Sequence, residues 1–291
     1  MNFINILNHI LRPLEWVVAQ LLTLFHHALV TFGMTAGPSP AWGITIMCLV
    51  LVIRICLLPL FLSQMRAMQR IQVLQPQIQR IQHKYAARKD PRSKEAMQRE
   101  IMALQQRYNA NPLGSCLPSL IQAPILCSLF YTLQSLPAIA DGNAEPLGGI
   151  DHTMAGDIES SSIFGVRIAD SFGTVASPQS RIIIGVAVAL MCLTLFAIQW
   201  MLIHRNTSKD AMVSPQFRVQ KMTVFVFPAI YVVSGATLPF GVLLYWLTNN
   251  LWNLGQTLCQ LRWFPTPGSA AGERKARRDY EQDNRRRAAA G

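Results

Sequence analysis

The feature that most constrains this chain is a set of apolar stretches that are each long enough to cross a lipid bilayer as a helix. The hydrocarbon core of a bilayer is about 30 Å thick, and about 20 apolar residues in helical conformation span it. Four regions meet this requirement, but Gly235, Pro239 and Gly241 divide the last one into two. The sequence therefore predicts an all-α polytopic membrane protein with five transmembrane helices, at residues 41–63, 113–135, 181–203, 221–236 and 240–261.

Composition favours the same class of protein. Only 14% of the residues are charged, against about 25% in soluble domains. A net charge of +11 could indicate a nucleic-acid partner, but the chain has no aromatic-interleaved or base-reading motif, so DNA is not expected. The six cysteines lie in apolar segments without a CxxC pair, which predicts free thiols.

The basic residues set the predicted orientation. Segment 64–111 has ten Lys/Arg and three acidic residues. Segment 204–221 has four Lys/Arg and one acidic residue, and the tail 262–291 has eight Lys/Arg and four acidic residues. The loop 136–180 has one Arg and six acidic residues. Because short basic connections stay in the cytoplasm, the cytoplasmic loop 204–220 and the C-terminus are predicted inside and the acidic loop outside.

The first 36 residues predict an amphipathic helix that lies on the outer membrane interface. Residues 7–32 mix an apolar surface with polar side chains, and a sixth span is the alternative. His26 and His27 point about 100° apart on a helix, so they are interpreted as interfacial groups and no metal site is expected. No basic residue precedes Arg12 and no clear cleavage site follows, so a removable signal peptide is not expected.

The segment 64–111 predicts a cytoplasmic hairpin of two antiparallel helices. Apolar residues recur at three- and four-residue spacing over 63–85 and 93–108, and Ser93 is a plausible start for the second arm. Three roles remain open: a solvated structural element, a docking arm for a partner protein or lipid head groups, and an RNA-binding arm. His83 and Lys84 near the tip fit a targeting receptor and a solvated face equally well.

Arg54 stands within the apolar run LVLVIRICLLPL at residues 49–60. A charge near the bilayer centre costs about 2.5–3.5 kcal/mol on insertion scales, so such residues face a partner or a wet cavity. The five predicted spans contain no Asp or Glu, and the uncharged amides that they offer include Gln122, Gln134, Gln199, Asn249, Asn250 and Gln256. This pattern favours a hydrated intramembrane groove with a positive potential, the alternative being an arginine held by amides and carbonyls for packing alone.

Three stretches together resemble the YidC family of membrane protein insertases. They are VIRICLLPLFLSQMRAMQRIQVLQPQIQRIQHKY, NPLGSCLPSLIQAPILCSLFYTL and LPFGVLLYWLTNNLWNLGQ, and the resemblance covers about residues 41–262 in matching order. The YW, NN and GQ pairs are similar to those of actinobacterial members. Ser115 stands where the family usually has a glycine, and no large extracytoplasmic domain precedes the first span, as in Gram-positive members.

The resemblance implies a fold, an activity and a set of partners. Five helices would surround a hydrophilic groove, with an interfacial helix before the first span, in a bacterial plasma membrane. The family's groove positions fall on Arg54, Gln122, Gln199, Trp246 and Asn250. The chain would insert nascent membrane proteins and act as their chaperone, alone or with the Sec translocon. The short tail leaves ribosome docking open, and Trp246 could instead be an aromatic lipid anchor.

Two other classes of function are alternatives to an insertase. An anion or small-solute transporter could use Arg54, but the chain shows no internal repeat of the kind common in transporters. An intramembrane protease needs a nucleophile and base or paired acids, yet His204 is the one histidine near the predicted core and paired acids are lacking there. No P-loop is present. We therefore expect neither an enzyme nor a cofactor.

Overall fold

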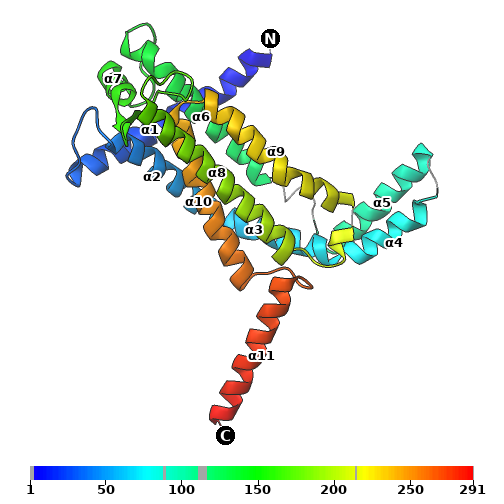
Figure 1. Cartoon of the computed structure of the whole chain (residues 1–291). Coiled ribbons are helices and arrows are strands. Elements are labelled where there is room, and N and C mark those ends of the chain that lie inside the picture. The colour runs from blue at the N-terminus through cyan, green and yellow to red at the C-terminus, as the bar shows by residue number, and fades with distance from the viewer. Residues whose placement is uncertain (1–2, 88–89, 111–116, 214, 291) are drawn as a thin grey trace. The chain divides into compact units, whose positions relative to one another are not determined.

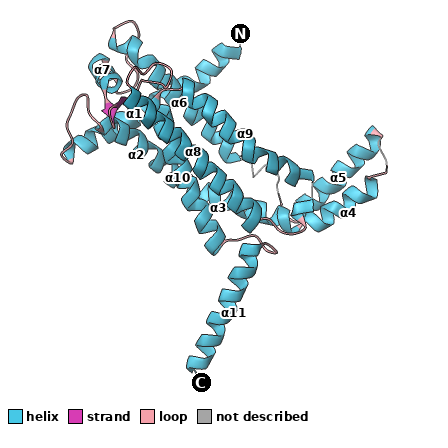
Figure 2. Cartoon of the chain, viewed as in Figure 1, coloured by secondary structure: helices cyan, strands magenta, loops and turns pink. Residues whose placement is uncertain are grey.

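The computed structural model describes residues 3–87, 90–110, 117–213 and 215–290, and these residues form mostly α-helices (Figures 1 and 2). The chain divides into two compact units. The first consists of Met1–Leu57, Pro118–Thr194 and Pro228–Trp252. The second consists of Leu58–Leu117, Leu195–Phe227 and Asn253–Gly291. Residues 113–116 of the predicted second span lie outside the described residues.

The first unit is built from helices packed around large apolar side chains. It contains α1 (Phe3–Thr31), α2 (Ala41–Cys56), α6 (Leu117–Ala140), α7 (His152–Ser160), β1 (Ser162–Ile163), β2 (Val166–Arg167), and parts of α8 (Pro178–Arg205), α9 (Pro215–Thr237) and α10 (Phe240–Trp263). Helix α1 packs against α2, and the His26 ring stacks on Trp42 with 3.7 Å between ring centroids. Trp42, Leu129 and Tyr245 are almost fully buried in this core.

The segment expected to form one helix over residues 41–63 is broken in the structure. Helix α2 ends at Cys56 and α3 (Leu58–Val73) begins two residues later. Pro59 has no backbone N–H to donate to a carbonyl of the preceding turn, which explains the break. Arg54 therefore lies in the last turn of α2, where the carbonyl end of the helix favours a positive charge.

The predicted loop 136–180 contains regular structure that the sequence did not predict. Helix α6 extends into it as far as Ala140, α7 follows, and β1 and β2 form a short antiparallel hairpin. The carbonyl oxygens of Asp170 and Ile168 accept the N–H groups of Phe240 and Gly241, at 2.7 and 2.9 Å. This loop thereby satisfies the first free amides of α10 and fixes where that helix begins.

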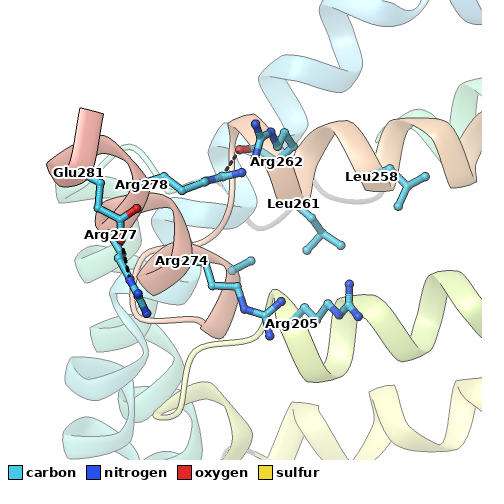
Figure 3. A pocket seen from close by; sticks show the side chains of 9 residues that line it. Arg205, Leu258, Leu261, Arg262, Arg274, Arg277, Arg278 and Glu281 are labelled. Atoms are coloured by element: carbon cyan, nitrogen blue, oxygen red, sulfur yellow. Dashed lines mark hydrogen bonds and ion pairs between the residues drawn. The ribbon is translucent and has the colours of Figure 1, made fainter. Parts of the chain in front are cut away.

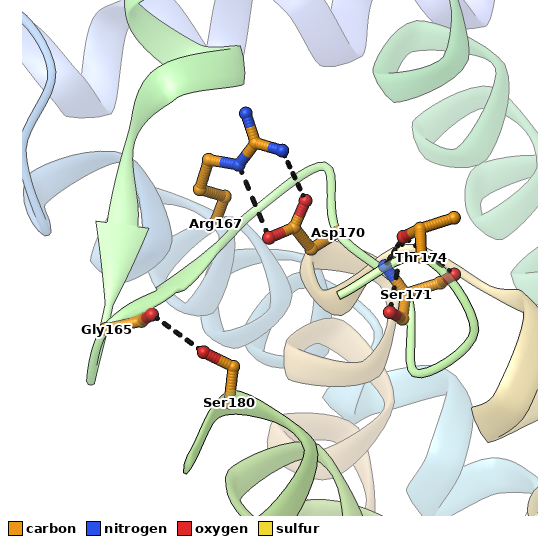
Figure 4. A network of polar contacts seen from close by, with 6 residues as sticks. All are labelled: Gly165, Arg167, Asp170, Ser171, Thr174 and Ser180. Carbon is orange, nitrogen blue, oxygen red and sulfur yellow. Dashed lines mark hydrogen bonds and ion pairs between the residues drawn. The ribbon is translucent and has the colours of Figure 1, made fainter. Parts of the chain in front are cut away.

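Side-chain contacts hold this loop in shape (Figure 4). The Arg167 guanidinium forms an ion pair with Asp170, with 2.8 Å between Nη2 and Oδ1. The Ser180 hydroxyl at the start of α8 donates to the carbonyl of Gly165 at 3.1 Å. The backbone at Asp170 that caps α10 is thus tied to its own loop.

The second unit contains a helical hairpin. Helix α4 (Gln75–Tyr85) pairs with α5 (Pro91–Arg107), and the two arms share a small core that includes buried Leu74 and Ile78 (Figure 1). Lys84 and Glu100 join the arms by an ion pair of 2.8 Å.

Two details of the predicted hairpin differ from the structure. The arm predicted over 63–85 is interrupted at Leu74, because Pro76 in the first turn of α4 cannot donate to the preceding turn. The second arm begins at Pro91 rather than at Ser93. The Asp90 carboxylate caps it by accepting the Ser93 N–H at 2.8 Å, which is the usual geometry of an N-cap.

The basic tail forms a helix, α11 (Ala270–Ala290), that follows a short turn. The Asn206 side-chain oxygen accepts the Thr266 N–H at 2.9 Å, and Ser208 pairs with Ser269 through a backbone bridge. The Ser269 hydroxyl in turn accepts the Gly272 N–H at 3.2 Å in the first turn of α11. These contacts link the beginning of α11 to the residues that follow α8, where the short 3₁₀ helix η2 (Ala211–Val213) lies.

Several helices are long and apolar enough to cross a membrane. Within the described residues these are Leu11–Thr31, Gln122–Ala140, Pro178–Arg205 and Phe217–Thr237, and α2 with α3 qualifies as a fifth if the broken pair is one span. Helix α10 carries Asn249, Asn250 and Gln256 and does not meet the same hydropathy criterion. The alternative of a span within residues 1–36 stays open, because part of α1 does meet it.

Candidate functional site

Arg54 is held by an uncharged amide. Its Nε donates to the Asn249 side-chain oxygen at 2.7 Å, and its Nη2 donates to the same oxygen. The guanidinium is half-buried, and no ion pair found in the described ranges involves it. Because Nε and Nη2 both donate to the single Asn249 oxygen, the N–H groups of Nη1 remain available to a further acceptor.

Tyr245 and Gln122 complete a polar cluster around this arginine. Tyr245 lies four residues before Asn249 on α10, so both side chains project from one face of the helix. The Tyr245 hydroxyl accepts a hydrogen bond from the Gln122 amide on α6 and lies near Arg54. We call Arg54, Gln122, Tyr245 and Asn249 the arginine cluster; three helices, α2, α6 and α10, contribute to it.

The arginine cluster has positive charge and spare hydrogen-bonding capacity. The Gln122 side-chain oxygen is buried without a partner in the described part of the chain, and so are Thr45 Oγ1 and Thr132 Oγ1 elsewhere in the first unit. Buried polar atoms are almost always satisfied by protein or by water. The first unit therefore has an interior that favours water or a polar ligand at several points.

Trp246 and Asn250, which were also predicted as groove residues, each follow a member of the arginine cluster by one residue on α10. Trp246 is half-buried and stacks on Tyr231 of α9, with 5.0 Å between ring centroids. It also packs against both apolar clusters of the first unit. Asn250 is 2% exposed. No hydrogen bond found between described residues joins either of them to Arg54, so their place in a groove stays a prediction.

Gln199, the last of the predicted groove residues, is half-buried on α8 and belongs to the second unit. Within that unit a cavity of about 210 Å³ opens among helices α3, α8, α9 and α10. Its lining combines amides with flexible apolar side chains: Phe61, Gln64, Met65, Met68, Gln72, Leu202, Asn206, Thr207, Gln220 and Gln260. We call it the amide–methionine cavity. Gln199 does not line it, and the role of Gln199 remains a prediction.

Sequence reasoning missed parts of both sites. It named Asn249 only among the amides available to Arg54 and assigned the groove to Asn250, whereas Asn249 accepts the hydrogen bond. It did not single out Tyr245, although the spacing of four residues to Asn249 was a usable signal. The amide–methionine cavity was signalled by Met65, Met68 and Gln72, which recur on one face of α3.

The arrangement has no feature of a metal centre. In the described ranges, no group of three or more His, Cys, Asp or Glu side chains could hold a metal ion. The five cysteines in those ranges, Cys48, Cys56, Cys127, Cys192 and Cys259, are free thiols. What the arginine cluster can do chemically is bind an anionic or polar group without forming a covalent bond.

Comparisons with known proteins assign the chain to a family. Residues 34–266 match the family model described as the 60Kd inner membrane protein. The membrane protein insertase YidC of Bifidobacterium longum is 42% identical over 292 residues, which cover 100% of this chain and 86% of that relative. The chain belongs to the YidC family of membrane protein insertases. The matched region contains every residue of the arginine cluster.

Other YidC proteins match over most of the chain. The Tropheryma whipplei protein is 31% identical, over 94% of this chain and 90% of the relative. The Streptomyces avermitilis protein is 34% identical, over 92% of this chain and 61% of the relative. A crystal structure of an active YidC insertase with its first transmembrane domain resolved aligns at 22% identity and a TM-score of 0.47, over 86% of this chain and 46% of that chain.

Proposed function

We propose that this YidC-family chain moves short hydrophilic, often acidic, tails of nascent membrane proteins across the bilayer and releases their apolar segments into lipid. The observation that carries the proposal is the arginine cluster. Arg54 stands in an apolar helix, its Asn249 partner is uncharged, and part of its guanidinium is unoccupied. A charge kept without a counter-charge is suited to a transient anionic ligand.

The neutral partner determines how the arginine can work. Asn249 fixes the orientation of the guanidinium, but it leaves the positive charge uncompensated. A carboxylate on the substrate tail can then accept charge-assisted hydrogen bonds, which are about twice as strong as neutral ones. Because no carboxylate in the described part of the chain pairs with Arg54, the tail is held while it crosses and released when the apolar segment leaves.

Burial of the apolar segment in lipid supplies the free energy for insertion. The amide–methionine cavity supports this step, because thioethers adapt to apolar side chains of different shapes. Gln199, Trp246 and Asn250 are proposed as further groove residues that lower the hydrocarbon barrier to the tail. No nucleotide is required, since the transfer into lipid is downhill.

The proposed setting is a bacterial plasma membrane with the hairpin α4–α5 and the C-terminus in the cytoplasm and residues 1–36 at the outer interface. The chain would act alone on small substrates and with the Sec translocon on larger ones. A targeting receptor at His83 and Lys84 and a ribosome at the basic tail are candidate partners.

Reconstitution tests the proposed function. The purified chain in lipid vesicles is mixed with a single-span substrate that carries an acidic tail, and protease protection of the tail is measured. We expect protection to require the chain, and vesicles that lack it serve as the control. Flux of small anions through the same vesicles without protection of the tail would instead support the transporter alternative.

A further inference from the structure

The second unit has another cavity, apart from the amide–methionine cavity, and this one is lined by charged residues. It has a volume of about 480 Å³ and is formed by the ends of α8 and α10 together with α11 (Figure 3). Five arginines and one glutamate line it with apolar residues: Arg205, Leu258, Leu261, Arg262, Ala271, Arg274, Arg277, Arg278 and Glu281. We call it the arginine cavity. The proposed insertion mechanism does not use it.

The charges of this cavity are only partly compensated. Arg277 pairs with Glu281 at 2.9 Å, and Arg278 donates to the Arg262 backbone carbonyl at 2.9 Å (Figure 3). The guanidinium groups of Arg205, Arg262 and Arg274 have no hydrogen-bond or ion-pair partner in the described part of the chain. Three unpaired guanidinium groups around one cavity repel one another unless an anion joins them.

Some basic residues outside the cavity are already paired with acidic side chains. Beyond the cavity, Arg287 forms an ion pair with Asp283 at 2.8 Å. Lys209 is likewise paired with Glu273, at 3.2 Å. Guanidinium groups bind phosphate oxygens in a bidentate manner, so the chemistry that best fits the unpaired arginines is a phosphate ester.

The apolar part of the cavity indicates which phosphate ester. Leu258 is 51% exposed, and Trp263, next to the lining residue Arg262, is 58% exposed. Arg205 is the last residue of α8, a helix that is long and apolar enough to span a membrane. The cavity therefore combines phosphate ligands with exposed apolar side chains at the end of a candidate span, where lipid head groups lie.

We propose that the arginine cavity binds the headgroup phosphate of an anionic phospholipid. Arg205, Arg262 and Arg274 hold the phosphate, and Leu258 and Leu261 contact the glycerol and acyl region. Because α8, α10 and α11 all contribute, bound lipid fastens α11 to the membrane surface. Basic pockets at the ends of membrane helices have the charge that such head groups require. This proposal does not depend on the insertion activity.

Lipid titration of the purified full-length chain tests the proposal. Phosphatidylglycerol or phosphatidylcholine is added to the chain in neutral detergent, and bound lipids are counted by native mass spectrometry. The test variant carries Arg205→Gln and Arg274→Gln. The matched control carries Arg285→Gln and Arg286→Gln, which remove the same charge from α11 outside the cavity.

We expect the apparent Kd for phosphatidylglycerol to rise about tenfold or more in the cavity variant and less than about twofold in the control. Equal weakening in both variants would overturn the proposal, because it would show general attraction to a basic tail. Inorganic phosphate and a short RNA are tested as competitors. Displacement of the lipid by equimolar inorganic phosphate would identify a free-anion site, and binding of RNA but not lipid through the cavity would identify a nucleic-acid site.

A second measurement covers the case in which the cavity variant does not fold. A photoactivatable phosphatidylglycerol is added to the unmodified chain, and the labelled peptides are identified. Labelling confined to the cavity-lining ends of α8, α10 and α11 supports the site. Labelling spread evenly over the membrane-facing helices contradicts it.

Discussion

Replacing Arg54 with glutamine removes the charge of the arginine cluster but keeps a side chain that can donate to Asn249. The polar cluster can therefore persist, with Tyr245 still bonded to Gln122. What disappears is the charge-assisted binding of an acidic tail. We expect insertion of an acidic-tailed substrate to slow, while folding of the protein is largely preserved.

The size of the effect follows from the unoccupied donors. A hydrogen bond to a charged group contributes about 1.5–3 kcal/mol, and each 1.36 kcal/mol changes a rate about tenfold. If the tail uses the free Nη1 of Arg54 in the rate-limiting crossing, Arg54→Gln slows insertion about 10- to 100-fold. Arg54→Lys keeps the charge but loses the planar fork, so an intermediate rate is expected.

The assay is the rate at which the tail of a single-span substrate becomes protected from protease in vesicles. Arg66→Gln is the matched control, because Arg66 is exposed on α3 and carries the same charge. A substrate whose acidic tail residues are replaced by amides should respond little to Arg54→Gln. Equal rates for Arg54→Gln and Arg66→Gln on the acidic substrate would refute the electrostatic reasoning.

Three other predictions follow from single contacts. Asn249→Asp supplies an internal counter-charge, so acidic tails should insert more slowly in the same vesicle assay although the protein folds. Gly241→Ala places a methyl group 2.7 Å from Ile168 Cγ2 and should lower stability by about 1–3 kcal/mol in thermal unfolding. Lys84 holds the pKa of Glu100 below its ordinary value of 4.5, so Lys84→Met should raise that pKa in an NMR titration.

Each of these predictions has its own control or direction. Gly255→Ala is the control for Gly241→Ala. Gly255 lies on the same helix, and a Cβ added there would have no atom within 4 Å, so this substitution should not destabilise the protein. Because the pKa of Glu100 is lower in the folded protein than in the unfolded chain, ionised Glu100 stabilises the fold at pH values above its unfolded pKa. This contribution is lost as the pH falls through the pKa of the folded state. An unchanged Glu100 pKa in Lys84→Met, or faster insertion by Asn249→Asp, would contradict the respective contact.

The length of the apolar runs predicted a helical membrane protein, because few other structures satisfy the backbone inside a bilayer. The break between α2 and α3 was harder to predict. A proline such as Pro59 can kink a helix or end it, and its surroundings decide which. The β1–β2 hairpin left no periodic signal, because its strands are two residues long.

The candidate site could likewise be predicted only in part. The lack of Asp and Glu in the predicted spans indicated that amides would solvate Arg54, and Asn249 does so. Which of the two adjacent asparagines would face it could not be predicted, since neighbours on a helix point about 100° apart. The rotation of α10 depends on the burial of Tyr245 and on the carbonyl of Asp170 that caps it. Those contacts are long-range.

Site-specific photocrosslinking tests the central claim most directly. A photoreactive residue is placed at position 54, 122 or 246, and each protein is given a stalled single-span nascent chain with an acidic tail. We predict crosslinks to the tail from positions 54 and 122 and to the nascent chain from position 246, all lost once the chain is released into lipid. Crosslinks only to neighbouring helices of the protein itself would show that Arg54 is a structural charge and would contradict the proposed mechanism.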